Sequence, residues 1–119
     1  MNDKPKETST EILKRILPQL QEMGLTEVIV TYDGGGDEGS VQDVVGYKGK
    51  KEVRIDMPLY DELDEACVLS LQEKGIDWCN GNGGCGKYEI NVKTRKAKLS
   101  HQERVEEYHD EDFDEEEIN

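Results

Sequence analysis

The stretch "LTEVIVTYDGGGDEGSV", residues 25–41, decides the fold because an apolar run passes directly into a glycine-rich, acidic segment. Residues 25–32 are rich in β-branched and aromatic side chains, which is typical of a strand. Since strand side chains alternate, Val28, Val30 and Tyr32 would share one face and Ile29 the other. Apolar residues on both faces predict a strand in the middle of a sheet.

Periodic segments on both sides of this strand predict the other elements. Thr8 and Glu11 match a capping box at the start of a helix, and apolar residues recur at helical spacing as far as Met23. Residues 57–75 predict a second helix, and alternating residues predict four more strands at 40–49, 51–56, 87–92 and 96–101. The sequence therefore predicts an α+β fold in the order α-β-β-β-α-β-β, with two helices packed on one face of a mainly antiparallel five-stranded sheet.

Length and composition predict how the chain is divided. The 119 residues fit one domain. We expect a flexible N-terminal arm at residues 1–7, a single α+β domain at 8–108 and a disordered acidic tail at 109–119, because the end of the chain is highly charged and poor in apolar residues.

The charge is concentrated at the C-terminal end. The chain carries a net charge of -13, and residues 103–119 hold ten acidic residues and one basic residue, so they account for -9 of it. Such a balance disfavours direct binding to nucleic acid, which needs lysine and arginine, and binding to an anionic membrane surface. With no apolar run long enough to cross a bilayer and no signal peptide, we expect a cytoplasmic protein.

Two glycine-rich segments, residues 33–39 and 77–86, are the first candidates for a site. The first lacks the ligand spacing of a calcium loop, and its acids disfavour phosphate. A hairpin turn is the favoured interpretation of the first segment and a structural loop that of the second. The alternative is a polar pocket or enzyme site at the two loops, binding Ca²⁺, Mg²⁺ or a small ligand, formed by Asp33, Asp37, Asn80, His101 and Arg104.

Three cysteines form no paired framework. Cys67, Cys79 and Cys85 are expected as reduced thiols, although Cys79 and Cys85 flank one loop closely enough to bridge in an oxidising environment. A four-ligand zinc set would consist of Cys79, Cys85, His101 and His109, but the spacing matches no common zinc module.

The acidic end of the chain is the second candidate site. A run of carboxylates is often only solvated, and it can also attract a basic protein surface. The partner-binding residues would be Glu106, Glu107, Asp110, Glu111, Asp112, Asp114, Glu115, Glu116 and Glu117.

The glycine-rich motifs resemble a bacterial family of small acidic proteins of unknown function. Its first motif, YDGxGDxG, is matched by Tyr32, Asp33, Gly34, Gly36, Asp37 and Gly39. Its second, WxNxxGxxG followed by HxxR, is matched by Trp78, Asn80, Gly83, Gly86, His101 and Arg104. The chain departs from the family in the short segment before the second helix and in the two cysteines around the second loop. The resemblance implies that both loops belong to one unit, and it implies no activity.

These observations favour a small acidic interaction protein without enzymatic activity or cofactor. In its boldest form the hypothesis is a phage or mobile-element inhibitor that engages a basic, nucleic-acid-binding protein. The alternative is a domain that binds a divalent cation or small ligand, or an enzyme, with its site at the two glycine-rich loops. The sequence leaves the identity of the partner and the oligomeric state open.

Overall fold

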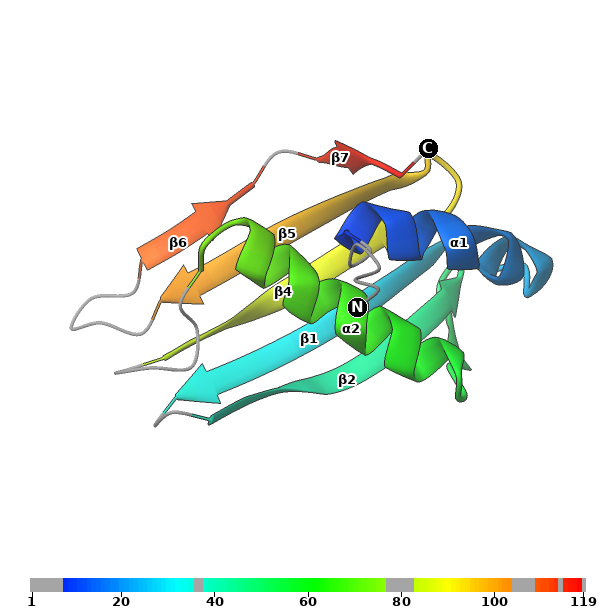
Figure 1. Cartoon of the computed structure of the whole chain (residues 1–119). Helices are drawn as coiled ribbons and strands as arrows, with labels where there is room; N and C mark the ends of the chain where they lie inside the picture. Colours follow the sequence, from blue (N-terminus) through cyan, green and yellow to red (C-terminus); the bar gives the residue numbers. More distant parts are fainter. Residues whose placement is uncertain (1–7, 36–37, 77–82, 104–108, 114, 119) are drawn as a thin grey trace, which may run out of the picture.

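The computed structural model describes residues 8–35, 38–76, 83–103, 109–113 and 115–118. Its elements are α1 (Ser9–Glu22), β1 (Glu27–Gly35), β2 (Glu38–Lys48), β3 (Lys51–Arg54), α2 (Leu59–Glu73), β4 (Gly84–Asn91), β5 (Lys96–Glu103), β6 (His109–Asp112) and β7 (Glu116–Glu117). Figure 1 shows both helices on the same face of one sheet. The predicted α+β class and the placement of the helices are therefore confirmed.

The sheet is antiparallel, with the order β3-β2-β1-β4-β5-β6 and with β7 also paired to β5. The central position predicted for β1 is confirmed, since β2 and β4 flank it. The predicted count of five strands is wrong because the described residues alone form seven, and the element order differs because β6 and β7 follow β5. Both added strands lie in the acidic end of the chain.

Residues 109–113 and 115–118, here named the C-terminal strip, form part of the sheet. The expectation of a disordered tail from residue 109 is therefore wrong for these residues. Two anchors explain the difference, because Ile118 is 1% exposed within the core and Phe113 packs against the core. The amides of Phe113 and Ile118 donate to the carbonyls of Leu99 and Arg95, at 3.0 and 2.9 Å. The expected arm at residues 1–7 lies outside the described residues, and the other domain boundaries stay predictions.

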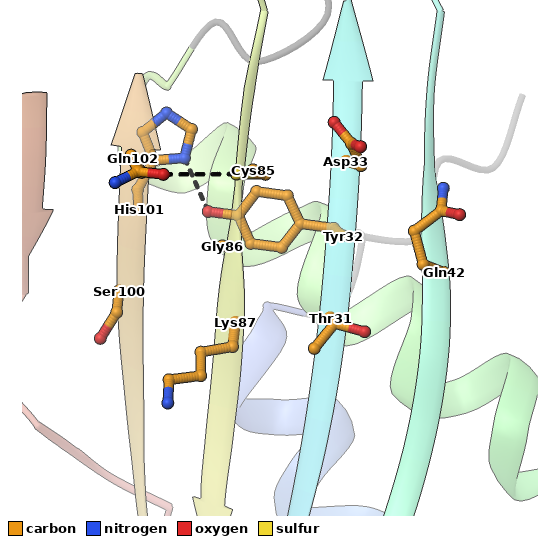
Figure 2. Close-up of a pocket in the computed structure, with 10 residues that line it drawn as sticks. All are labelled: Thr31, Tyr32, Asp33, Gln42, Cys85, Gly86, Lys87, Ser100, His101 and Gln102. Carbon is orange, nitrogen blue, oxygen red and sulfur yellow. Dashed lines mark hydrogen bonds between the residues drawn. The ribbon is translucent and has the colours of Figure 1, made fainter. Parts of the chain in front are cut away.

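The first glycine-rich segment closes a hairpin. β1 and β2 pair as far as Gly35 and Glu38, and their register shifts once, between Thr31 and Tyr32. The predicted hairpin is therefore confirmed, and residues 36–37 lie outside the described part of the chain. Thr31 and Asp33 lie on the face of the sheet that the helices leave open, and Figure 2 looks onto this face with the helices behind it.

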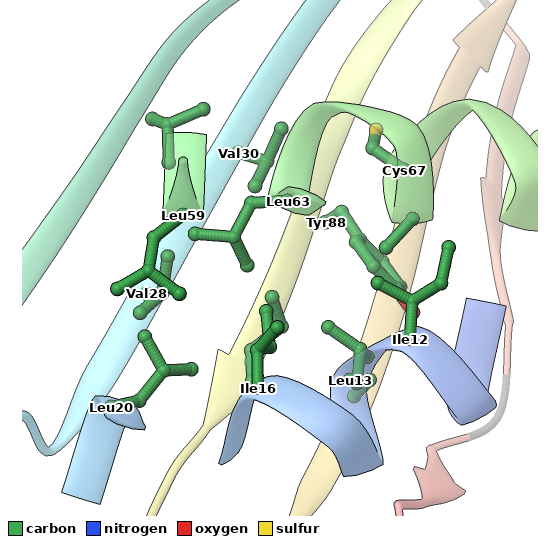
Figure 3. Close-up of a cluster of buried hydrophobic side chains, with 14 of the residues drawn as sticks. Ile12, Leu13, Ile16, Leu20, Val28, Val30, Leu59, Leu63, Cys67 and Tyr88 are labelled. Carbon is green, nitrogen blue, oxygen red and sulfur yellow. The ribbon is translucent and has the colours of Figure 1, made fainter. Parts of the chain in front are cut away.

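The core lies between the helices and the sheet (Figure 3). Val28, Val30 and Tyr32 of β1 are at most 2% exposed, as their shared face predicted. Burial of side chains of this size contributes about 1.5–3 kcal/mol each. The helices supply the other side of the core, and the stripe on α2 consists of Leu59, Leu63, Ala66, Cys67, Ser70 and Leu71. Within the described residues, no helix is long and apolar enough to span a membrane.

The capping box predicted for α1 is present. The Thr8 hydroxyl accepts from the Glu11 amide, and the Glu11 carboxylate accepts from the Thr8 amide. A second carboxylate from α2 ties the two helices together, because Glu73 accepts from both the amide and the hydroxyl of Ser9, each at 2.7 Å. Carboxylates are stabilised at a helix N-terminus by its unpaired N–H groups and its dipole. This contact fixes the end of α2 close to the start of α1.

Candidate functional site

The open face of the sheet is hollowed where β1, β4 and β5 run side by side. The cavity has a volume of about 570 Å³, which lies in the range of small-molecule sites. Its lining comes from four adjacent strands and comprises Thr31, Tyr32, Asp33, Gln42, Cys85, Gly86, Lys87, Ser100, His101 and Gln102. It therefore lies next to both glycine-rich segments, as the predicted polar pocket would.

The strand register explains the hollow. Thr31, Lys87 and Ser100 form one row across β1, β4 and β5, and Asp33, Cys85 and Gln102 form the next row on the same face. Short side chains such as Thr31 and Ser100 leave space between longer ones such as Lys87 and Gln102 (Figure 2). The thiol of Cys85 donates to Gln102 Oε1 at 3.8 Å, which is a weak contact.

Between these two rows lies a third row, which consists of Tyr32, Gly86 and His101. The side chains of Tyr32 and His101 belong to the helix-covered face. The Tyr32 hydroxyl and His101 Nδ1 share a buried hydrogen bond of 2.7 Å, and their rings are nearly parallel with centroids 5.8 Å apart. Gly86 permits this contact because a Cβ there would lie 2.5 Å from the Tyr32 hydroxyl and 2.2 Å from the Ser100 carbonyl oxygen. Position 86 therefore requires glycine because neighbouring atoms lie too close for a Cβ, and not because of its backbone dihedral angles.

The second glycine-rich segment was predicted to continue as a loop to Gly86, and this prediction is wrong at its end. β4 begins at Gly84, so Gly84, Cys85 and Gly86 already pair with β5. A Cβ on Gly84 would lie 2.6 Å from a ring carbon of His101. The two glycines therefore accommodate buried rings within a strand. Residues 77–82 lie outside the described part of the chain.

Burial determines the protonation of the groups behind the cavity. Burial raises the pKa of Tyr32 well above its usual value of 10.0, with smaller contributions from Cys67 and Cys85. The Tyr32 phenol therefore stays neutral and keeps a proton for its hydrogen bond with His101. Burial also raises the pKa of the Cys67 thiol, to about 12, which leaves this cysteine an unreactive core residue.

The predicted ligand residues are only partly brought together. Asp33 and His101 border the same cavity, but they belong to adjacent rows on opposite faces of the sheet, so their side chains do not face each other. Asp37, Asn80 and Arg104 lie outside the described residues, as does Cys79 of the possible disulfide and zinc set. Within the described part of the chain, no three histidine, cysteine or acidic side chains are grouped to hold a metal ion.

Sequence reasoning missed the cavity residues Thr31, Lys87, Ser100 and Gln102. The alternation of residues 87–102 could have indicated Lys87, Ser100 and Gln102, because it places Lys87 opposite Ser100 once β4 and β5 are aligned. The alignment itself depends on residues far apart in the chain, so it was not readable from a short segment.

The predicted partner-binding residues lie in and around the C-terminal strip. Asp110, Glu111 and Asp112 are in β6, at the end of the strand order, and Glu106, Glu107 and Asp114 lie outside the described residues. Glu115 and Glu117 are exposed, whereas Glu116 is half-buried. β6 and β7 lie along one edge of the sheet (Figure 1), so the acidic residues of both strands follow that edge.

Lys74 holds the C-terminal strip against α2. Its Nζ forms an ion pair with Glu116, donates to the Ser70 hydroxyl at 3.3 Å and lies 5.7 Å from the centre of the Phe113 ring. The Lys74 side chain is only 15% exposed, so this contact is screened less than a surface ion pair. The acidic strip is therefore joined to the body by one cation as well as by its two apolar anchors.

Comparison with known proteins finds one family model that matches part of the chain. The model of a family described as "Family of unknown function (DUF6878)" matches residues 10–59, which run from α1 to the start of α2. No curated protein and no solved structure matches the chain. Over this first part of its sequence, the chain is similar to a family of unknown function.

Proposed function

We propose that this protein is a non-enzymatic interaction protein whose acidic C-terminal strip engages a basic surface of another protein. The observation that supports this function most is the position of the strip. Its carboxylate-bearing residues are spread along an ordered sheet edge, anchored by Ile118 and Lys74, instead of on a free tail. An ordered array of charges loses less conformational entropy on binding than a flexible one.

The class of partner follows from charge complementarity. A surface rich in lysine and arginine, such as that of a protein that holds nucleic acid, would be attracted by the net charge of -13. In this role the protein would inhibit its partner by occupying the basic surface in place of nucleic acid. We infer a cytoplasmic setting, which the free thiols of Cys67 and Cys85 support because thiols stay reduced in that compartment. A bacterium, phage or mobile element as the source is part of the hypothesis.

Neutralising the strip tests this function without removing Ile118 from the core. The variant carries Asp110→Asn, Asp112→Asn, Glu115→Gln and Glu117→Gln. Its matched control loses the same number of charges at exposed positions outside the strip, through Glu22→Gln, Glu52→Gln, Asp61→Asn and Glu65→Gln. Both are titrated with oligolysine and with a basic nucleic-acid-binding protein, at low and moderate salt.

The strip variant should bind much more weakly than the control variant, and the difference should shrink as salt screens the charges. Equal binding by the two variants would remove the strip from the mechanism. It would leave only a general attraction to the net charge.

A second candidate function is the binding of a small polar ligand in the cavity. It is supported by hydroxyl, amide, carboxylate and ammonium groups that line one hollow of about 570 Å³. They include those of Asp33 and Lys87, whose rows share the open face of the sheet. A divalent cation would need ligands from the glycine-rich loops, such as Asp37 and Asn80. Ca²⁺ or Mg²⁺ at millimolar concentration should then raise the melting temperature, and EDTA should reverse the effect. An Asp33→Asn variant with the same response would contradict the cation version.

A further inference from the structure

β6 is the outermost strand in the order of the sheet. One of its sides pairs with β5, and among the described residues no strand pairs with its other side. We propose that this free side of β6 binds an extended, lysine- or arginine-rich segment of the partner as an additional antiparallel or parallel strand. The inference rests on the proposed function and adds the mode of binding. Strand addition supplies main-chain hydrogen bonds, and the charges supply specificity for a basic segment.

The backbone hydrogen bonds show which residues of β6 have outward-facing groups. Phe113 donates its amide to the carbonyl of Leu99. These two residues continue the register by one step beyond the pair of Ser100 and Asp112, so they form a hydrogen-bonded pair. In an antiparallel ladder such pairs alternate with pairs that do not exchange hydrogen bonds. Glu111 and His109 therefore direct their backbone groups toward β5. Asp110 and Asp112 direct theirs away from the sheet, where an added strand would meet them.

The sequence of β6 defines the partner's chemistry. Three of its four residues, Asp110, Glu111 and Asp112, carry carboxylates. A strand added beside β6 would lie about 4.8 Å away, so its side chains would be direct cross-strand neighbours of these residues. Opposite charges at such positions are favourable and like charges are unfavourable. The edge therefore accepts a basic strand and rejects an acidic one.

A second copy of this chain is a poorer occupant. Two β6 strands would place carboxylates against carboxylates. The opposite edge, β3, carries Lys51 and Arg54 but also Glu52, and each copy brings a net charge of -13 to the contact. This repulsion opposes an edge-to-edge assembly. The favoured occupant is thus a different protein with a basic extended segment.

Two variants with the same charge separate strand addition from simple attraction. Asp110→Asn with Asp112→Asn removes two charges and keeps both outward amides, whereas Asp110→Pro with Asp112→Pro removes the charges and the amides. Proline is tolerated on an edge strand where its nitrogen faces solvent, so both variants should keep the fold. The probe is a capped peptide of alternating lysine and valine, about six residues long, the common length of a strand.

A modified probe makes the test independent of any protein variant. The same lysine–valine peptide with N-methylated backbone amides keeps its charge but cannot donate hydrogen bonds to the carbonyls of β6. The full chain should bind the unmodified peptide about tenfold more tightly than the N-methylated one, which corresponds to about two net hydrogen bonds. The proline variant should bind the unmodified peptide about tenfold more weakly than the asparagine variant.

The other outcomes would overturn the inference. If the two variants bind equally well, and the full chain binds the two peptides equally well, charge alone attracts the partner. Strand addition then fails and the proposed function stands. No binding of the unmodified peptide, of oligolysine or of the basic protein would remove the proposed function as well. A mass that rises with concentration for the full chain, but not for the proline variant, would identify a second copy as the occupant.

Discussion

β1 and the C-terminal strip are both parts of one sheet, but they are held there in different ways. β1 carries its own apolar alternation, with Val28, Val30 and Tyr32 buried under the helices. The strands of the strip carry almost only acidic residues, and their anchors, Phe113 and Ile118, come directly after each strand. The comparison teaches that a charged segment can be ordered by a few neighbouring contacts that its composition does not reveal.

The largest effect is expected from a charge placed under β1. Val30→Asp would bury a carboxylate without a partner at a position that is 0% exposed, at a cost of about 3–5 kcal/mol. Since small domains have a total stability of about 5–15 kcal/mol, the whole domain should melt far earlier or fail to fold. Circular dichroism with thermal unfolding measures this. A variant with a nearly unchanged melting temperature would contradict the core assignment.

The same substitution in the strip should act locally. Ile118→Asp also charges a buried position, but the strip can leave the core and take the carboxylate into water. The loss is then limited to about 1.5–3 kcal/mol, the value of burying one isoleucine side chain. NMR should show random-coil shifts for residues 109–118 and native shifts for β1 and β4. Global unfolding would mean that the strip and the sheet centre form one cooperative unit.

The contrast between β1 and the C-terminal strip also shows which elements could be predicted from the sequence alone. The helices, β1 and the hairpin of β4 and β5 were predictable because each has a continuous period of apolar residues. The C-terminal strip was not predictable, because nine of the eleven residues at 109–119 are polar or charged and only Phe113 and Ile118 are apolar. Their partners, such as Leu99 and Arg95, become neighbours only after β5 is in place.

The candidate site shows the same limit. Asp33 and His101 were identified from their residue types and their position near glycine-rich segments, and both border the cavity. Their placement on adjacent rows, with side chains on opposite faces, follows from the register between β1, β4 and β5, which no short segment encodes. The glycines at 84 and 86 were read as loop residues because glycine usually marks turns, whereas here they lie beneath buried rings.

A smaller effect is expected at the row that joins the centre of the sheet to β5. Gly86→Ala would bring a methyl group to 2.2 Å from the Ser100 carbonyl and should destabilise the domain by about 1–3 kcal/mol. Lys87→Ala, at the next position but exposed, is the matched control and should change little. Urea denaturation of both variants gives the comparison. Equal midpoints would show that the Tyr32–His101 contact tolerates a side chain beneath it.

The smallest effect is expected from the ion pair of the strip. Lys74→Gln removes the contacts with Glu116 and Phe113, and it should cost about 0.5–1 kcal/mol, less at high salt. Arg54→Gln is the control, because the Arg54 and Asp56 side chains are 90% and 76% exposed and their pair should contribute nothing measurable. Unfolding curves at low and high salt test both. A loss that is equal for the two variants would contradict a special role for Lys74.

Amide hydrogen exchange of Phe113 and Ile118 tests most directly whether the acidic strip is an ordered edge of the sheet. Both amides donate to backbone carbonyls, those of Leu99 and Arg95, so they should exchange far more slowly than in an unstructured peptide. Ile118→Asp should abolish this protection while the amides of β1 remain protected. Exchange of Phe113 and Ile118 at the unstructured rate in the unmodified chain would contradict the account.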